Sequence, residues 1–235
     1  NSTSSLTATW SGFSDTLSGI QQYEYAVGIG SGVAVFSAIG DTPYDEMQEI
    51  ELQGYIAQLN ELDLIPWMIH LGDIKDGSAA CSEGVYSQVA SYLLEMDSPV
   101  YIIPGDNEWN DCADPAEAWG FWEGTFARFH ENWDEHPWTV HQGVRDENFS
   151  FVDDGVLFVG INLVGGAIHD AEEWAARYED DLAWWQARID EVGDGVGAAV
   201  LLGHALISPS YNDFFDGFRA SAAHGGKPVL YLHGD

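Results

Sequence analysis

The chain has 235 residues, a length that suits one large domain or one domain with an appendage. Its 39 acidic residues outnumber 7 basic ones and give a net charge of −32, and so acidic a surface repels nucleic acids and anionic membranes. No apolar run reaches the roughly 20 residues that a membrane-spanning helix needs. We therefore expect neither nucleic-acid binding nor membrane insertion. The acidity suits solubility in a salty or extracellular setting, where charge is screened, and it equally suits a dedicated role in binding cations.

The first 30 residues differ from the rest of the chain. They open as NSTSSLTATW, without the pattern of a signal peptide, which indicates a mature chain or one excised from a longer protein. Strand-like alternation surrounds Trp10 and the pair Tyr23 and Tyr25, and it resembles two strands of a fibronectin type III or immunoglobulin-like domain. Two strands are not stable alone in water. Residues 1–30 are thus a β-rich leader that either packs on the main domain or is a remnant of a longer, multidomain protein.

From Val33 onward the pattern alternates between strand, loop and helix. Short apolar runs that end in glycine predict buried strands, and apolar positions repeating at helical spacing predict amphipathic helices. Asp114-Pro115 starts the third helix with a favourable cap, and Asp153-Asp154-Gly155 forms the turn of a hairpin. The predicted helices cover 45–62, 82–96, 114–133 and 170–192, and the strands include 64–70, 148–152, 156–163, 198–203 and 228–232.

Five of the apolar runs end in glycine followed by an acid or a histidine. These terminal residues are Asp41, Asp73, Asp106, His204 and Asp235. The first three are separated by roughly 30 residues, the length of a βαβ unit. In an open α/β sheet, ligands bind beyond the carboxyl ends of the strands, so the five side chains should converge. Carboxylates that lie so close together repel one another unless a positive charge lies among them. A metal ion is the simplest such charge.

The ordered motifs are IGDTPY (39–44), HLGDIKDG (70–77), PGDNEWNDC (104–112), LLGHALIS (201–208) and YLHGD (231–235). In this order they resemble the calcineurin-like metallophosphoesterases. The residues of the motifs are similar to those of a bacterial-type branch of that superfamily. The resemblance covers about residues 33–235. It implies an α/β fold of the αββα type, a β-sandwich flanked by helices, with the motifs at the carboxyl ends of strands. The metallophosphoesterase domain, residues 31–235, would then be cut short at its last motif.

The resemblance also implies a set of metal ligands. Asp41 matches the aspartate that binds one metal, and Asp73 matches the aspartate that bridges two. Asp106 takes the place of the usual asparagine, His204 that of the mid-chain histidine, and Asp235 that of the first histidine of the last motif. Oxygen donors with one imidazole suit Mn, Fe or Mg, and Zn remains an option. We expect one or two divalent or trivalent metal ions.

The implied activity is hydrolysis of phosphate mono- or diesters by metal-bound hydroxide, with a small phosphate ester as the partner. Two positions depart from the family pattern. Pro43 stands where the family has a histidine, and Asn107 replaces the histidine that protonates the leaving group. An amide cannot be a general acid near neutral pH. The candidate catalytic residues are therefore Asn107 and Glu108, with His70 or metal-bound water as other sources of the proton.

These departures leave a second hypothesis open: an eroded module of the same fold with a structural or adhesive role in an extracellular multidomain protein. Its partners would be other domains or copies within a larger assembly. Both hypotheses place the protein outside the cell or at its surface. The sequons at Asn1 and Asn148 favour a secreted glycoprotein.

Two cysteines and several histidines complete the candidates. Cys81 and Cys112 each follow an acid-bearing strand and lie at the same predicted edge. In a secreted protein they would pair as a disulfide, and in a reducing compartment they would be two free thiols. The remaining histidines have no spacing typical of ligands, and we expect them at the surface or beside the site: His130, His136, His141, His169 and His224.

Overall fold

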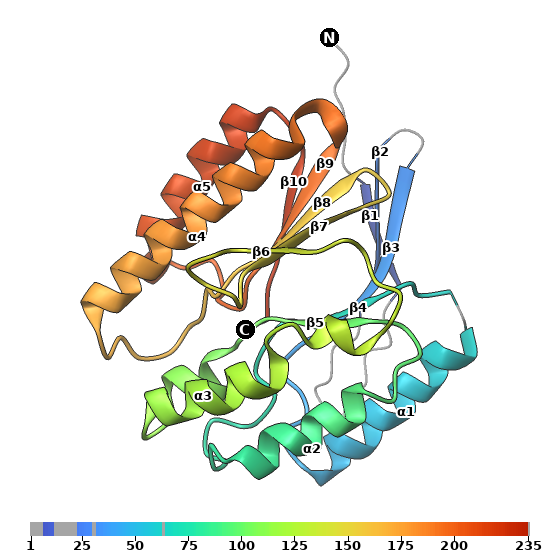
Figure 1. Ribbon diagram of the computed structural model, residues 1–235, viewed down its shortest axis with the longest axis vertical. Coiled ribbons are helices and arrows are strands. Elements are labelled where there is room, and N and C mark those ends of the chain that lie inside the picture. The colour runs from blue at the N-terminus through green and yellow to red at the C-terminus, as the bar shows by residue number, and fades with distance from the viewer. Residues whose placement is uncertain (1–6, 12–22, 30–31, 63, 235) are drawn as a thin grey trace.

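The computed structural model describes residues 7–11, 23–29, 32–62 and 64–234. Two five-stranded sheets lie face to face, and helices cover the outer face of each (Figure 1). This is the αββα sandwich that the sequence predicts. None of the described helices has the length and apolar character required to cross a lipid bilayer.

The first sheet has the strand order β1-β2-β3-β4-β5. β3, β4 and β5 run parallel, whereas β1 and β2 are antiparallel to their neighbours. The two strands of the predicted leader thus extend the sheet of the main domain, and their origin as a remnant of another domain stays a prediction. The strands are β1 (Thr7–Ser11), β2 (Tyr23–Ile29), β3 (Gly32–Ile39), β4 (Met68–His70) and β5 (Val100–Ile102).

Three helices cover this sheet. α1 (Glu46–Leu62) lies as predicted and buries the expected face of Leu52, Tyr55, Ile56 and Leu59. α2 (Glu83–Leu93) and α3 (Pro115–Phe126) are shorter than the sequence predicts.

The third helix does not run to Trp133 because its backbone leaves the helical conformation at Ala127, with a ψ of 127°. Arg128 then adopts a left-handed conformation, with a φ of 59°, and a short 3-10 turn, η2 (Phe129–Asn132), follows.

The second sheet has the order β10-β9-β8-β7-β6, in which β8, β9 and β10 are parallel. β7 and β8 form the predicted hairpin. The strands are β6 (Val140–His141), β7 (Phe149–Asp153), β8 (Val156–Gly160), β9 (Ala198–Leu202) and β10 (Val229–Leu232).

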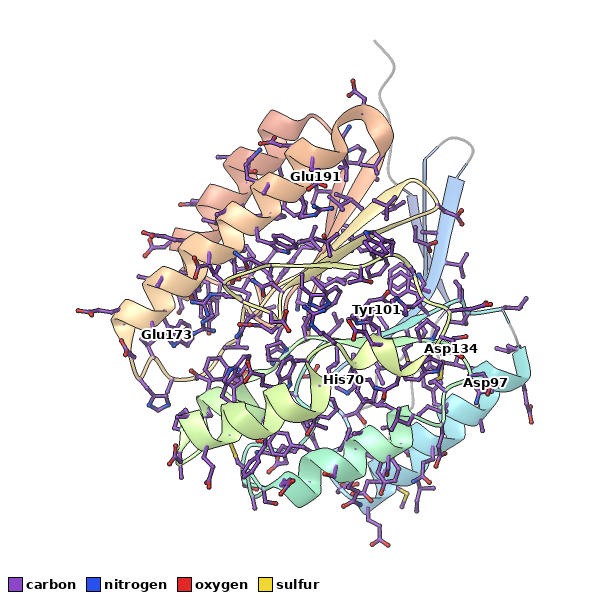
Figure 2. The ribbon with its side chains drawn as sticks, viewed as in Figure 1. His70, Asp97, Tyr101, Asp134, Glu173 and Glu191 are labelled. Carbon is purple, nitrogen blue, oxygen red and sulfur yellow. A yellow bond between two sulfur atoms is a disulfide. The ribbon has the colours of Figure 1, made fainter. Side chains whose placement is uncertain are left out.

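α4 and α5 cover the outer face of this sheet. α4 (Ala171–Val192) is capped by Asp170, whose side chain accepts hydrogen bonds from the first turn, and Figure 2 shows Glu173 and Glu191 at its two ends. α5 (Asn212–Gly225) has no counterpart among the predicted elements. Phe214, Phe215 and Phe218 bury its inner face against the sheet.

Aromatic rings pack against one another in the space between the sheets, among smaller aliphatic side chains. Trp67 is fully buried, stacks on Phe36 with ring centroids 4.5 Å apart, and meets Phe151 and Phe158 edge to face. Such rings contribute large apolar areas to the core. Their contacts fix the position of one sheet against the other, so that loops from both sheets meet at one edge of the sandwich.

The same packing overturns one prediction. Asn148, the acceptor of the second glycosylation sequon, is fully buried. Its amide nitrogen donates to Gln142 and to Asp181 at 2.7 Å each, and its oxygen accepts from the backbone of Asn162. A glycan would replace one of the two protons of this nitrogen and so remove one of these bonds, and the fully buried side chain leaves it no space, so the prediction for Asn148 is wrong. Asn1 lies outside the described residues.

Candidate metal centre

Asp41 and Asp73 occupy equivalent turns at the ends of β3 and β4. Both have a φ of 56°, a left-handed conformation that aspartate tolerates better than most residues. The backbone N–H of Asp41 donates to the carbonyl of Gly72 at 3.0 Å. The two Gly-Asp motifs therefore hold their aspartates in the same left-handed conformation, side by side.

The glycines of these motifs are required by close backbone contact. A Cβ on Gly72 would lie 2.5 Å from the nitrogen of Gly105 and 2.9 Å from Nδ1 of His204. A Cβ on Gly105 would overlap the backbone nitrogen and side chain of Asp73. Only a chain without side chains at these two positions brings the ends of β4 and β5 into such contact.

The third acid motif folds as a π-helical turn, η1 (Asp106–Asn110), a conformation that is frequent at functional sites. Glu108 lies fully buried in it. One of its carboxylate oxygens accepts from the N–H groups of Gly105, at 2.5 Å, and of Asp73, at 3.2 Å. Tyr86 donates from its hydroxyl to the carbonyl of Glu108. Glu108 thus ties the second motif to the third, and its catalytic role stays a prediction.

Asp73 lies at the middle of the cluster. Asn107 donates to both of its oxygens, from the backbone nitrogen at 3.0 Å and from the side-chain amide at 2.6 Å. Tyr44 directs its hydroxyl to Asp73 at 3.2 Å and to Asp41 at 3.4 Å. Sequence reasoning overlooked Tyr44, although its position three residues after Asp41 in GDTPY was a usable signal.

His204 faces these acids with a defined tautomer. Its Nδ1 lies 2.8 Å from the carbonyl oxygen of Leu71, and because a carbonyl only accepts, Nδ1 carries the proton. In the neutral ring Nε2 therefore presents a lone pair. That atom lies 3.1 Å from Oδ1 of Asp106 and 3.4 Å from Oδ1 of Asp73. Such a hydrogen bond from the second nitrogen to a backbone carbonyl is typical of histidines that bind metals.

Burial and neighbouring charges shift the pKa values of several side chains in the cluster. Burial favours the neutral form of Asp73, and with the nearby charge of Glu108 it raises the pKa of Asp73. Burial likewise raises the pKa of Glu108. Burial alone would lower the pKa of His204, but Asp106 and the charge of Asp73 raise it to about 10. The acids therefore favour a cation at Nε2 of His204, and a proton or a metal ion can fill that role.

The donor set fits a metal ion. Asp41, Asp73 and His204 each offer a ligand atom, and these atoms lie within 4.8 Å of one another. Oδ1 of Asp106 and Nε2 of His204 are buried 3.1 Å apart, and while Nε2 carries no proton neither has a hydrogen-bond partner, a costly arrangement unless a cation lies between them. Four of the five predicted ligands thus come together. The fifth, Asp235, lies outside the described residues, and its role stays a prediction.

His70 has a supporting position. It is fully buried, and Figure 2 shows it in the interior of the molecule. Its Nε2 bonds to the carbonyl of Thr42 at 2.8 Å, and its Nδ1 accepts from Gly72 at 3.2 Å. Burial lowers the pKa of His70 to about 4. Both nitrogens are therefore engaged in holding the first two motif turns.

A disulfide joins the loops on either side of the cluster. Cys81 and Cys112 are bonded, with Cα atoms 6.1 Å apart, so the prediction of their pairing is confirmed. Cys81 follows the second motif and Cys112 closes the third. The bond thus fixes the loops that carry Asp73 and Asp106.

A pocket of about 610 Å³ adjoins η1. Trp109 and Asn110 of that turn form part of its wall, together with Trp119 and Trp174. The charged residues of the lining are several acids and one arginine, Arg145. The pocket thus combines three tryptophans with a mostly acidic set of charged side chains.

No protein-family model matches the chain, and no curated protein matches it either. Among solved structures, one similar chain is described as "GAP50 the anchor in the inner membrane complex of Plasmodium". It has a TM-score of 0.55 and 12% sequence identity, and the match covers 84% of this chain and 64% of that one. A second is the NAD nucleotidase NadN of Haemophilus influenzae, with a TM-score of 0.42, 12% identity, and coverage of 97% and 36%.

This chain thus spans less than two thirds of each of these two proteins. At 12% identity the similarity to GAP50 shows a shared α/β fold and nothing of activity. The similarity to NadN is too weak to carry an argument.

Proposed function

We propose that the protein is a metal-dependent hydrolase of small phosphate mono- or diesters. The observation that supports this most is the convergence of Asp41, Asp73, Asp106 and His204, in which the facing atoms of the last two are buried 3.1 Å apart, placed to share a cation. The order of the motifs that carry these residues adds the resemblance to calcineurin-like metallophosphoesterases.

These four residues would hold one metal ion or two. A metal in such a site lowers the pKa of a bound water and neutralises the charge of a phosphate ester. At −32 the chain itself would repel a phosphate ester, so a local cation gives the anion a place to bind. The donor set of carboxylates with one imidazole suits Mn, Fe, Mg or Zn.

The other residues of the cluster would orient the ligands and the substrate. Asn107 has two amide protons, of which one is directed to Asp73, and we assign the other to a phosphate oxygen. Because the amide cannot release a proton near neutral pH, the leaving group must be protonated from elsewhere. The organic part of the ester would occupy the pocket beside Trp109, whose acidic lining residues favour a neutral or cationic group.

A buried lysine also belongs to this environment. Lys75 follows Asp73 by two residues and is almost fully buried, and its ammonium group donates to the carbonyls of Asp76 and Ala79 at 3.1 Å each. A cation fixed by two backbone carbonyls offsets part of the negative charge of the cluster. Its role in the proposal is to hold the Asp73 loop in shape.

A second function is a non-catalytic module with an anchoring role. Two observations favour it: Asn107 stands where the family has a titratable histidine, and the fold is shared with a protein described as an anchor. In both proposals the disulfide favours an oxidising, extracellular setting.

The test compares two acids of the same loop. Asp73→Asn removes a proposed ligand, whereas Asp76→Asn changes a half-buried acid whose carboxylate bonds to Ser78 in the same turn. Each protein is dialysed against a solution of a candidate metal (Mn, Fe, Mg or Zn), and its metal content is measured by mass spectrometry. Hydrolysis is measured with p-nitrophenyl phosphate and with the corresponding diester.

For the hydrolase we expect Asp73→Asn to lose bound metal and to lower kcat/KM on the order of 100-fold or more. Asp76→Asn should match the unchanged protein in both. Metal bound by the unchanged protein without hydrolysis of either ester would favour the module. Equal metal content in the Asp73→Asn variant would contradict both the assigned ligands and the hydrolase.

A further inference from the structure

A second group of imidazoles lies at the open edge of the sandwich, where β5 and β6 are the outermost strands of the two sheets. His130 of η2 and His141 of β6 stack ring against ring, with centroids 5.4 Å apart and planes within 12°. His130 also stacks on Tyr101 of β5, which is labelled in Figure 2, with ring centroids 4.7 Å apart. This group shares no residue with the candidate metal centre.

The tautomer of His141 is fixed in the same way as that of His204. Its Nδ1 lies 2.6 Å from the carbonyl oxygen of Asp146, so Nδ1 carries the proton. Its Nε2 is buried and has no hydrogen-bond partner. The ring thus presents a lone pair toward the interior of the group, with its other nitrogen held by a backbone carbonyl, as in known metal sites.

Packing alone does not account for this arrangement. A phenylalanine would provide the same ring stacking without a polar atom, whereas an unpartnered buried nitrogen costs about 1–3 kcal/mol. His130 is also almost fully buried, with 3% of its surface exposed. A buried imidazole packed against a half-buried one, with the buried Nε2 of His141 left unpartnered, is therefore better explained by a ligand that uses their nitrogens.

An acid completes the donor set. Glu131 neighbours His130, and one ligand atom from each of His130, Glu131 and His141 lies within 4.8 Å of the others. Glu131 is exposed and pairs with Arg128 at 3.1 Å. Arg128 keeps two further hydrogen bonds, to Asp146 at 2.8 and 2.6 Å. Glu131 can thus turn away from Arg128 without leaving the guanidinium unpaired.

We propose that His130, His141 and Glu131 form a second metal site, for Zn²⁺ or a cation of similar ligand preference. Two imidazoles and one carboxylate are a donor set that zinc favours over magnesium or calcium. Nitrogens on one tetrahedral zinc lie about 3.3 Å apart, given zinc–nitrogen distances of about 2.0–2.1 Å. The ligand atoms of this group lie within 4.8 Å of one another, so the rings must come closer, and one must turn out of the stacked arrangement for both lone pairs to point at the ion. The bound metal joins η2 to β6 and closes the open edge between the sheets.

The test is made in the Asp73→Asn background, which weakens the candidate metal centre and leaves the second site to be counted. Protein stripped with a chelator is titrated with Zn²⁺, and stoichiometry and affinity are measured by competition with a chromophoric chelator. The variants are His130→Phe, which retains the ring stacking, and Glu131→Gln, which changes an exposed side chain and should fold. His169→Gln, an exposed histidine beside Asp111, is the control.

We expect His130→Phe to bind one zinc equivalent fewer, and Glu131→Gln to bind that equivalent on the order of 10- to 100-fold more weakly. His169→Gln should bind as the background does. Equal stoichiometry and affinity in all four proteins would overturn the proposal.

A second measurement requires no change at the site. In the Asp73→Asn protein labelled with ¹⁵N, adding Zn²⁺ should shift the imidazole Nε2 signal of His141 and one nitrogen signal of His130. The His169 signals should stay in place. Unshifted signals of His130 and His141 at saturating Zn²⁺ would overturn the proposal independently of the variants.

Discussion

The candidate metal centre and the histidine group at the open edge use the same chemistry but are built differently. At the metal centre, acids follow successive parallel strands, and the strand ends themselves bring Asp41, Asp73 and Asp106 together. At the open edge, His130 comes from a 3-10 turn and His141 from a two-residue edge strand. A site made by parallel strand ends is visible in the sequence, whereas one made by the packing of irregular segments is not.

The two groups also differ in how firmly they are held. The loops of the metal centre are joined by the Cys81–Cys112 disulfide and by the backbone contact between Gly72 and Gly105. The histidine group is held by ring stacking and by the ion pairs of Arg128. Disturbing either kind of restraint should therefore affect one group and spare the other.

The largest effect should come from removing the disulfide. Replacing Cys81 and Cys112 by serine opens a loop with a sequence separation of 31, which lowers the free energy of unfolding by about 3–4 kcal/mol in the chain-entropy model. Urea denaturation measures this loss. In the folded double variant, metal should bind more weakly at the candidate centre, while Zn²⁺ binding at His130 and His141 stays the same. A loss of metal binding confined to His130 and His141 would contradict the proposed difference in how the two groups are held.

The backbone contact should give the next largest effect. Gly105→Ala places a methyl group against the backbone of Asp73, and we expect it to lower the free energy of unfolding by about 3 kcal/mol. Gly54→Ala is the matched control, because Gly54 lies in α1 with no atom within 4 Å of the added Cβ. That change should stabilise the protein by about 0.5–1 kcal/mol. Similar effects of the two changes would exclude a special constraint at Gly105.

The sequence predicted the fold well where local pattern and topology agree. The helix of residues 46–62, the hairpin of β7 and β8, and the strands that carry the motifs all follow from periodicity and turn chemistry. α5 was not predicted, because Gly217 interrupts its sequence and its helical face becomes evident only through the burial of Phe214 and Phe218. α3 ends early because Arg128 turns the chain, a conformation that no local signal in the sequence predicts.

The candidate site was predictable to a similar extent. The positions of Asp41, Asp73, Asp106 and His204 followed from strand ends, and the structure brings these residues together. The position of Glu108 beneath them depends on the π-helical turn, which the sequence does not signal. The grouping of His130 with His141 depends on how the irregular segment between η2 and β6 folds back, and no regular spacing in the sequence signals it.

A third prediction concerns pH, in protein stripped of metal. Burial lowers the pKa of His130 to about 3, so the unfolded chain binds the proton more readily than the folded one. The contribution of the neutral His130 ring to the free energy of unfolding is complete above its ordinary pKa of about 6.5, and this contribution is lost as the pH falls. Relative to His130→Phe, the unchanged protein should lose about 1–2 kcal/mol between pH 6.5 and 5, after allowance for solvent screening.

Asp73 should show the opposite sign. Burial raises its pKa, so the folded chain holds the proton more tightly, and stability falls as the pH rises through the folded pKa. Relative to Asp73→Asn, the unchanged protein should therefore become more stable as the pH falls from 7 to 5. Urea denaturation across this range, in the presence of a chelator, measures both slopes. Slopes of the same sign would show that the two groups do not differ electrostatically as the structure indicates.

The smallest effect should come from Tyr44→Phe, which removes only the hydroxyl that bonds Asp41 and Asp73. These contacts are long, at 3.2 and 3.4 Å, and the loss of such a weak hydrogen bond costs about 0.5–1 kcal/mol, so metal affinity at the candidate centre should fall about two- to fivefold. Tyr178→Phe is the matched control, because the hydroxyl of Tyr178 is buried without a partner and its removal should be neutral or slightly stabilising. Unchanged affinity in Tyr44→Phe would mean that strand topology and the glycine contacts alone position the two acids, without help from the tyrosine.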